Sequence, residues 1–189
     1  QPNIKTASES LFYVDAVSGS DKNSGLSPKK AWMTLKHARS QVFGKATVIV
    51  AGGEYPKFVE NRAPGKRGQL TFRAAKGAMP VLNGVEIDYP VQSKANLVFD
   101  GFLIRSSGAA NTVLLRNTQT VSLVNSQVTP ERWSLGPKAP VTAVLVDSSK
   151  EILIKRVKLQ GAMRGVLVRS SEHVSVINNY IIAKGGTAV

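Results

Sequence analysis

Residues 144–154 read VLVDSSKEILI, and residues 166–176 read VLVRSSEHVSV, 22 positions later and without a gap. Each stretch has apolar residues at alternate positions, then a Ser-Ser pair, then a second apolar run. Short alternating runs rich in Val, Ile and Leu are typical of strands, and the small polar residues between them are typical of turns. Self-similarity at a fixed period is the signature of repeat proteins, so the two stretches predict coils of about 22 residues.

The same pattern continues towards the N-terminus with looser spacing. Four apolar positions recur 31 residues before their counterparts in 144–154, namely Val113, Leu115, Val121 and Leu123. This spacing is nine residues longer than the 22-residue period, and residues 131–139 supply the insertion. Earlier coils follow: Leu97 and Phe99 lie 24 residues before Val121 and Leu123, and Val48 and Val50 lie 22 residues before Leu70 and Phe72. We therefore expect at least five or six coils.

Burial determines how these coils stack. Neighbouring residues of a strand point to opposite faces, so Val174 and Val176 are predicted to point inward and Ser175 outward. Equivalent residues of successive coils then stack about 4.8 Å apart and form one core. Leucine-rich repeats have a similar period, but their fixed Leu and Asn pattern is absent, and each period here holds two or three strand-like pieces. The sequence predicts an all-β fold, a right-handed parallel β-helix.

Asparagines follow two of the predicted strands at the same position. Asn178 comes two places after Val176, and Asn125 comes two places after Leu123. An inward asparagine at a bend would form hydrogen bonds with the coils above and below it. Gly101 and Arg156 occupy the other rows of this column, so we expect Arg156 to turn outward or the turn to widen there.

The N-terminal region predicts a helix. Ser27 and Pro28 form a helix start, and Trp32, Leu35, Ala38 and Val42 follow at helical spacing. A helix over residues 29–42 would cap the first coil, whose strand edge needs a cover. The chain thus divides into an extension (1–10), a first strand with the capping helix (11–46), and the coils (47–189). No cap is visible near residue 189, so we expect further coils beyond it or a protein partner at that open end.

Charge and composition restrict the function. The chain has 25 Lys plus Arg against 12 Asp plus Glu, a net charge of +13, which attracts polyanions. A local excess lies at Lys57, Arg62, Lys66, Arg67, Arg73 and Lys76. Without interleaved aromatic residues this pattern disfavours nucleic acid and leaves an acidic glycan, an anionic membrane or a generally basic surface.

Other features of the sequence bear on chemistry and location. The absence of cysteine excludes disulfides, thiolate metal sites and a cysteine nucleophile. No stretch approaches the roughly 20 apolar residues that span a bilayer. The chain starts at Gln1 and not at Met, which suggests a removed leader. We expect a protein that is secreted or on the cell surface.

Several short motifs carry a resemblance. They are Tyr13-Val14-Asp15, Gly19-Ser20-Asp21, Asn23-Ser24-Gly25, Thr34-Leu35, Gly53-Glu54-Tyr55 and Leu97-Val98-Phe99-Asp100-Gly101. Over residues 11–189 the chain resembles the pectate-lyase-like superfamily of right-handed parallel β-helices. The resemblance implies a secreted protein that acts on or binds an extended acidic polysaccharide, as polysaccharide lyases and uronan epimerases do. The superfamily also contains non-catalytic glycan-binding proteins and parts of cell-surface or phage-type assemblies, so that alternative remains.

The resemblance also indicates where a ligand would bind. The family's cleft follows the strands that correspond to residues 112–116, 142–147 and 164–169. Their outward column contains Arg116, Asp147 and Arg169, with Arg164 at a strand start, and arginine pairs bidentately with carboxylates. Arg132 and Trp133 in the insertion complete the predicted substrate-binding residues. The alternatives are a cross-coil charge ladder for the column and an apolar lid over Leu114, Leu145 and Leu167 for the insertion.

No catalytic residue is assigned from the sequence. A lyase must neutralise a uronate carboxylate, remove the adjacent proton and protonate the leaving oxygen. In the family a bound calcium ion often contributes, so calcium is a candidate cofactor. However, only Asp147 is acidic in the column, and Glu151 and Glu172 lie in the next turn, so no calcium ligand set is evident. His37 and His173 have no second histidine at ligand spacing, and no other metal or cofactor is predicted.

Overall fold

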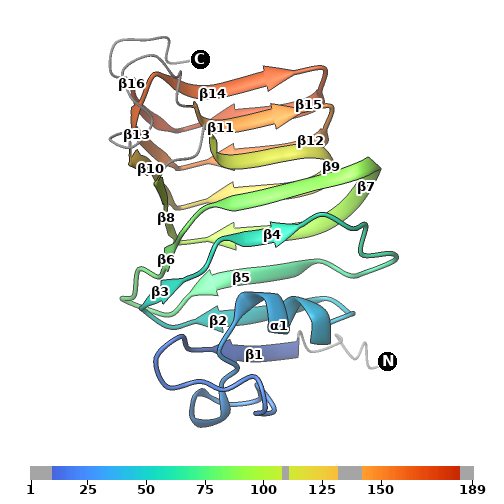
Figure 1. Ribbon diagram of the computed structural model, residues 1–189, viewed down its shortest axis with the longest axis vertical. Coiled ribbons are helices and arrows are strands. Elements are labelled where there is room, and N and C mark those ends of the chain that lie inside the picture. Colours follow the sequence, from blue (N-terminus) through green and yellow to red (C-terminus); the bar gives the residue numbers. More distant parts are fainter. Residues whose placement is uncertain (1–9, 108–110, 132–141, 184–189) are drawn as a thin grey trace, which may run out of the picture.

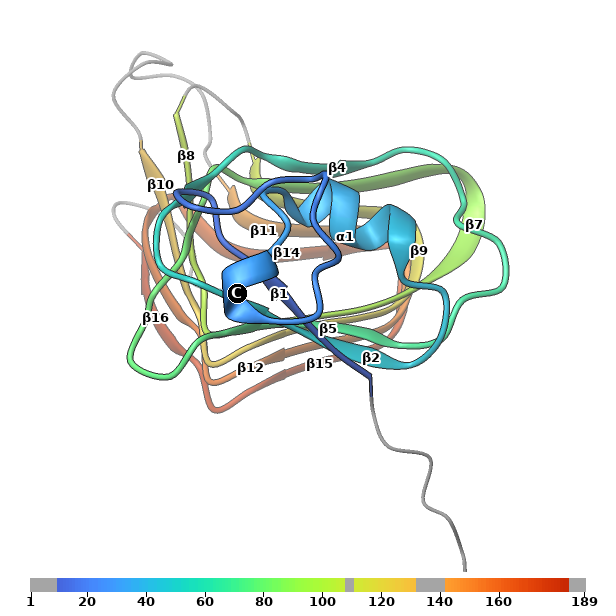
Figure 2. The ribbon, with the colours of Figure 1, turned by 90° about the horizontal axis from the view of Figure 1, so that it is seen from below.

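The chain folds into a parallel β-solenoid whose coils stack along one axis (Figure 1). The computed structural model describes residues 10–107, 111–131 and 142–183. Viewed from the N-terminal end, the chain runs clockwise as it recedes, which is the sense of a right-handed coil (Figure 2). The predicted all-β solenoid is therefore confirmed.

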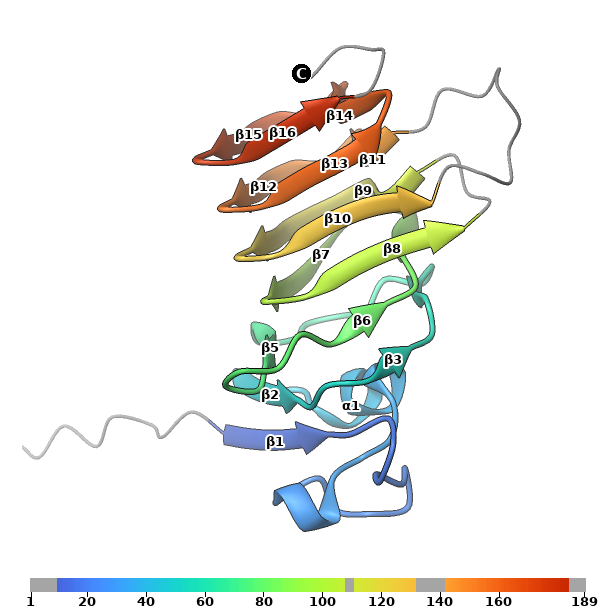
Figure 3. The ribbon, with the colours of Figure 1, turned by 90° about the vertical axis from the view of Figure 1, so that its left-hand side faces the viewer.

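A full coil has three faces, which we call face 1, face 2 and face 3. Face 1 consists of β1 (Ser10–Val14), β2 (Ala46–Val50), β5 (Leu70–Ala74), the second halves of β7 (Val85–Asp100) and β9 (Asn111–Val124), β12 (Lys150–Lys155) and β15 (Glu172–Ile177). Face 2, in front in Figure 3, consists of β3 (Glu54–Tyr55), β6 (Val81–Leu82), β8 (Leu103–Ser107), β10 (Gln127–Glu131), β13 (Lys158–Ala162) and β16 (Tyr180–Ala183). Face 3 consists of β4 (Phe58–Glu60), the first halves of β7 and β9, β11 (Thr142–Asp147) and β14 (Arg164–Arg169).

The strand register confirms the repeat. Val144 pairs with Val166 of the next coil and with Val113 of the preceding coil, so both the 22-residue repeat and the 31-residue spacing are correct. Leu97 pairs with Val121, as their separation predicts. These residues are 0–3% exposed, because each stacks on its counterpart inside the solenoid.

One predicted register is wrong. Val48 pairs with Phe72, and Ala46 takes the predicted place opposite Leu70. The coil between β2 and β5 is thus two residues longer than the 22-residue period. A shift of two residues leaves the inward and outward alternation unchanged, so the apolar pattern could not distinguish the two registers.

Aromatic rings fill the N-terminal half of the core. Phe58 packs edge-on against Phe72 and Phe99, with ring centroids 5.8 and 5.4 Å apart. Phe102 continues the cluster 6.0 Å from Phe99. All four are at most 4% exposed. Each buried ring removes a large apolar area from water and adds edge-to-face attraction, so this cluster anchors the first coils.

The turn between faces 1 and 2 differs from the prediction. Gly101, Asn125, Arg156 and Asn178 all have positive φ, between 49° and 87°. In this left-handed conformation the side chains of Asn125, Arg156 and Asn178 point outward and are exposed. The predicted inward asparagines are therefore wrong, whereas the outward position of Arg156 is confirmed. Arg156 Nε donates to Asn125 Oδ1 at 2.6 Å on the outer surface.

The inward polar position is one residue later in the same turn. Asn179 Oδ1 accepts from the Val157 amide at 2.8 Å, and its Nδ2 donates to the Ile154 carbonyl at 2.9 Å. Ser126 Oγ accepts from the Phe102 amide at 3.1 Å. Adjacent coils are thus joined by side chains that satisfy backbone groups at the bend.

The predicted N-terminal helix is interrupted. A 3₁₀ turn, η1 (Pro28–Lys30), and a helix, α1 (Leu35–Gln41), replace one helix over residues 29–42, so a capping helix of that length is not confirmed. Thr34 is the actual N-cap, and its hydroxyl accepts from the His37 amide at 3.0 Å. In the first coil α1 lies next to β4, where later coils have face-3 strands (Figure 2). No helix of the described residues is long and apolar enough to cross a membrane.

An irregular segment covers the outer edge of β1. The Trp32 amide donates to the Tyr13 carbonyl at 2.9 Å, and the Asp15 amide donates to the Trp32 carbonyl at 2.8 Å. The Trp32 ring stacks on Phe12 with centroids 5.1 Å apart. Trp32 therefore pairs with the strand edge instead of continuing a helix, because the edge amides and carbonyls need partners.

Candidate functional site

The predicted substrate-binding residues on face 3 form one row. The register places Asp88, Arg116, Asp147 and Arg169 at the same position of four successive strands. Arg116 Nη1 lies 3.0 Å from Asp88 Oδ2, and its Nε lies 3.5 Å from Asp147 Oδ2. Arg169 Nη2 lies 3.2 Å from the same Asp147 oxygen. The face-3 row therefore alternates in charge and is neutral in sum, which agrees with a cross-coil charge ladder.

The row keeps some capacity to bind a ligand. The side chains of Arg116 and Arg169 are 39% and 53% exposed, and each guanidinium has five N–H donors, of which the aspartates use few. Arg164, also exposed, begins β14 opposite Thr142. Arg132 and Trp133 lie outside the described residues, so their predicted role stays a prediction.

The predicted apolar stripe lies beside this row. Leu114, Leu145 and Leu167 stack in register on the outer side of face 3. Leu145 is only 4% exposed although its position points outward, and the other two are partly buried. The stripe thus exposes almost no surface at Leu145 and only part of the side chains at Leu114 and Leu167.

The carboxylates near the row are each bonded to other side chains, and calcium binding stays a prediction. Asp147 faces two guanidinium groups, Glu151 accepts from Thr120 Oγ1 at 2.8 Å, and Glu172 pairs with Lys150 at 3.3 Å. Calcium requires six to eight oxygen ligands around one point. Within the described ranges no three His, Cys, Asp or Glu side chains converge in this way.

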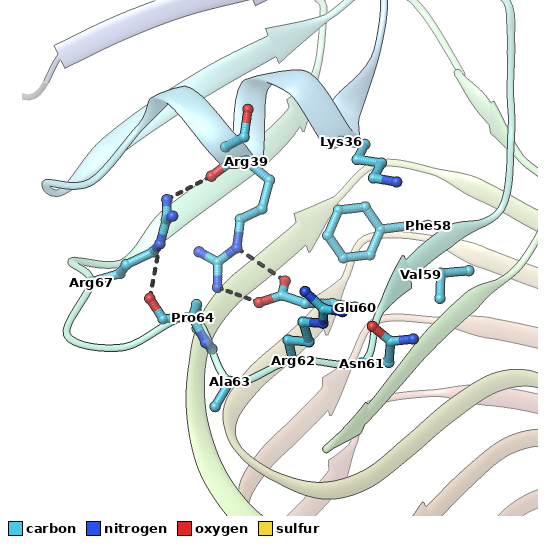
Figure 4. Close-up of a pocket in the computed structure, with 11 residues that line it drawn as sticks. Lys36, Arg39, Phe58, Val59, Glu60, Asn61, Arg62, Ala63, Pro64 and Arg67 are labelled. Carbon is cyan, nitrogen blue, oxygen red and sulfur yellow. Dashed lines mark hydrogen bonds and ion pairs between the residues drawn. The ribbon is translucent and has the colours of Figure 1, made fainter. Parts of the chain in front are cut away.

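A pocket that the sequence did not predict lies at the N-terminal end of face 3, between α1 and the segment after β4. We call it the Arg39 pocket (Figure 4). Its volume is about 340 Å³. The charged side chains that line it are Lys36, Arg39, Glu60, Arg62 and Arg67.

Arg39 and Glu60 form a buried ion pair at the base of this pocket. Their side chains are 8% and 11% exposed, and Arg39 Nε and Nη2 each lie 3.0 Å from a different Glu60 oxygen. Arg39 Nη2 also donates to the Ala95 carbonyl at 2.8 Å. The remaining nitrogen, Nη1, is buried and has no hydrogen-bond partner among the described residues. A buried charged donor without an acceptor is costly, so this atom would gain from an added oxygen ligand.

Tyr89 completes the network without offering a catalytic base. Its hydroxyl donates to Glu60 Oε1 at 2.9 Å. Burial and then the negative charge of Glu60 raise the pKa of Tyr89 well above its ordinary value, so the phenol stays protonated. Glu60 is itself engaged by Arg39 and Tyr89. The described groups of the pocket therefore suit binding better than proton abstraction.

Arg67 forms the wall opposite Glu60. Its Nη1 donates to the carbonyls of Arg39 and Val42 at 2.7 and 2.9 Å, and its guanidinium lies 4.2 Å from the centroid of the Phe43 ring. A cation that binds the last carbonyls of α1 is favourable because these carbonyls carry partial negative charge. Arg67 is thereby held rigidly beside Arg39.

Besides Arg39, five cations line the Arg39 pocket and an adjoining hollow lined by residues 65–68, Lys94 and Asn96. We call them the basic surface: Lys36, Arg62, Lys66, Arg67 and Lys94. In the described part of the chain none of them forms an ion pair with a carboxylate. The basic surface is therefore one place in the described part of the chain where several positive charges lie together without a carboxylate partner.

The sequence identified this surface only in part. Arg62, Lys66 and Arg67 belong to the local charge excess noted above, but Lys57 and Arg73 of the same excess pair with Glu86 and Asp100. Lys36 and Lys94 come from α1 and β7 and join the surface only through the winding of the chain. Arg39 and Tyr89 had no signal of their own in the sequence.

Fold and surface together define the chain as a parallel β-solenoid with a basic pocket at the N-terminal end of face 3. No protein-family model and no curated protein matches the sequence. Among solved structures, the chain is similar to the native GH136 lacto-N-biosidase from Eubacterium ramulus, with 14% identity and a TM-score of 0.41 over 88% of this chain and 33% of that one. Its selenomethionine derivative gives 13% and 0.42, over 89% of this chain and 33% of that one.

A rhamnogalacturonan lyase is a further similar structure. It shows 15% identity and a TM-score of 0.33, over 85% of this chain and 56% of the lyase. The chain thus spans about a third of the length of the lacto-N-biosidase and just over half that of the lyase. Likenesses of this size carry no conclusion about activity.

Proposed function

We propose that this protein binds an extended acidic polysaccharide along face 3. The observation that carries the proposal is the basic surface, whose five cations have no carboxylate partner among the described residues. Like charges gathered without counter-charges repel one another, so an anionic ligand would be favoured there. The overall charge of +13 adds long-range attraction for a polyanion.

The shape of the solenoid supports a polymeric ligand. Strands of face 3 repeat about 4.8 Å apart, so equivalent side chains recur in a straight line from β4 to β14. Arg116 and Arg169 lie along one such line beyond the basic surface, and Arg164 lies at the opposite end of β14. A linear chain of repeating sugar units would contact several strands at once, and many weak contacts would then add up.

Binding without catalysis is favoured by the engagement of the acidic groups. A lyase needs a base beside the uronate, but Glu60 and Asp147 are each held by neighbouring cations or hydroxyls. The lyase or epimerase reading remains the second candidate, with its base among residues other than these. Since acidic polysaccharides are abundant outside cells, we also propose a secreted or cell-surface location.

Retention on immobilised polysaccharide tests the proposal. The protein is applied to columns of polygalacturonate, alginate, chondroitin sulfate and neutral dextran and eluted with a salt gradient. We expect retention on at least one acidic polymer, none on dextran, and elution at moderate salt because ions screen exposed charges. Absence of retention on every acidic polymer would overturn the proposal.

A charge-matched pair of variants locates the binding surface. Lys36→Ala/Lys66→Ala/Lys94→Ala removes three cations from the basic surface and should elute at clearly lower salt. The control removes three exposed lysines elsewhere, Lys22, Lys76 and Lys158. Equal shifts in both variants would mean that net charge alone causes retention. Absorbance near 235 nm, from unsaturated uronate, would instead establish a lyase.

A further inference from the structure

The Arg39 pocket has more positive charge than its own carboxylate can neutralise. Lys36, Arg39, Arg62 and Arg67 line it, and Glu60 is the one carboxylate among its lining residues. Both oxygens of Glu60 are already bound, by Arg39 and by the Tyr89 hydroxyl. Glu60 therefore compensates Arg39 and leaves the other three cations without a counter-charge in the pocket.

Two guanidinium groups lie side by side at the base with unused donors. Arg39 Nη1 is buried and has no acceptor, and Arg67 Nη2 makes no hydrogen bond with the described residues. Burial and then the charge of Arg39 lower the pKa of Arg67. Figure 4 shows the Arg39 guanidinium between Arg67 and Glu60, with Arg62 beside Glu60 and Lys36 next to Phe58.

We propose that the Arg39 pocket binds one carboxylate or sulfate group of the acidic chain. An oxygen of this group would accept from Arg39 and Arg67, while Lys36 and Arg62 would contact the group from the rim. A planar or tetrahedral oxyanion offers several acceptors at the spacing of guanidinium donors, which neutral sugars do not. This inference rests on the proposed function and names the chemical group that is recognised and the residues that recognise it.

Small anions test the pocket separately from the polymer. Sodium glucuronate supplies the carboxylate and sodium sulfate the sulfate, and each is titrated into the full chain at constant ionic strength, with calorimetry or amide NMR shifts as the readout. We expect saturable binding of at least one of them. The anion that binds more tightly assigns the group.

Substitutions at the rim and the base locate the binding. Lys36→Ala/Arg62→Ala should weaken anion binding by about fivefold or more, since two charge-assisted contacts are lost. The control Lys76→Ala/Lys158→Ala removes the same charge from exposed positions elsewhere and should change affinity by less than about twofold. Arg39→Lys keeps the charge but removes the guanidinium fork and should also weaken binding, with thermal unfolding used to verify its fold. If Arg39→Lys does not fold, the rim variant decides.

The outcomes separate this inference from the proposed function. Absence of saturable binding of either anion, or equal affinity in the rim variant and the wild type, would overturn the inference. If the protein is nevertheless retained on an acidic polymer, the proposed function stands without the pocket. If small anions bind in the pocket but no acidic polymer is retained, the proposed function is wrong and the pocket is a site for a small oxyanion.

Discussion

The buried ion pair of Arg39 and Glu60 should contribute far more to stability than an exposed pair of the same type. In Glu60→Gln the guanidinium of Arg39, 8% exposed, would keep the Ala95 carbonyl and one amide oxygen but no counter-charge. Removing one partner of a buried pair costs about 3–5 kcal/mol. We expect about 3 kcal/mol, the lower end, because glutamine still accepts one hydrogen bond from Arg39.

Glu86→Gln is the matched control. Glu86 lies one coil from Glu60 on face 3 and pairs with Lys57, and the two side chains are 34% and 39% exposed. Pairs of this exposure contribute roughly 0–1 kcal/mol, because water screens both charges. The same chemical change at two neighbouring positions thus differs mainly in burial.

Urea denaturation followed by circular dichroism measures both variants. With a slope of about 2 kcal/mol per molar urea, Glu60→Gln should lower the midpoint by about 1.5 M, and Glu86→Gln by at most about 0.5 M. Equal midpoints for the two variants would refute the reasoning, because they would mean that water reaches Arg39 as easily as Lys57.

Three further outcomes follow from contacts elsewhere in the solenoid. Asp147→Asn should lower the free energy of unfolding by about 1 kcal/mol, because it removes ion pairs with Arg116 and Arg169. The same substitution leaves both arginines free for an acidic polymer and should therefore raise the salt needed for elution. Elution at lower salt would contradict a binding role for the face-3 row. Arg156→Gly should stabilise the protein by about 0.5–1 kcal/mol, because φ is 54° at this exposed turn, and a lower melting temperature would refute this. Burial raises the pKa of Asp21, but hydrogen bonds from the Thr34 hydroxyl and from the amides of Thr34 and Met33 outweigh burial and hold the pKa below its ordinary 3.8. The folded state thus binds this proton more weakly than the unfolded state, so the stability that Asp21→Asn loses at pH 7 should decrease progressively from about pH 3.8 downward and disappear once the pH is below the lowered pKa of the folded state. A difference that persists in stronger acid would argue against this assignment.

The face-3 row illustrates what a repeat makes predictable. Once Val144 and Val166 are known to stack, Asp147 and Arg169 must stack as well, since a fixed offset separates them along each strand. The charge pairing of the row therefore follows from the sequence. Asp88, which pairs with Arg116 from the preceding coil, was not predicted. The coil between β7 and β9 departs from the 22-residue period, so the repeat does not place Asp88 in the row.

The N-terminal helix illustrates where local pattern fails. Trp32 has the spacing of a helix residue, but its backbone pairs with β1 and its ring stacks on Phe12. Tertiary contacts of this kind outweigh helix propensity, whose differences are below about 1 kcal/mol per residue. The helix consequently begins only after Thr34.

The asparagine column failed for a related reason. Asn125 and Asn178 were assigned an inward direction by extending the strand alternation past the end of the strand. A residue with positive φ bends the chain from face 1 to face 2 and breaks the strand alternation, so the inward position moves to Ser126 and Asn179. Alternation holds only as long as the backbone stays extended.

The sequence alone determined the solenoid, the direction of its core residues and the neighbours along a column wherever the 22-residue period or a recognisable insertion holds, because the apolar pattern recurs at that spacing. The Arg39 pocket and the basic surface depended on tertiary structure. Lys36, Glu60 and Lys94 belong to different coils, and only the winding of the backbone brings such residues together and decides which cations meet a carboxylate. Contacts between equivalent residues of successive coils follow from the repeat. The burial of a side chain, and the pairing of charges from non-equivalent positions, depend on three-dimensional distances that the repeat does not specify.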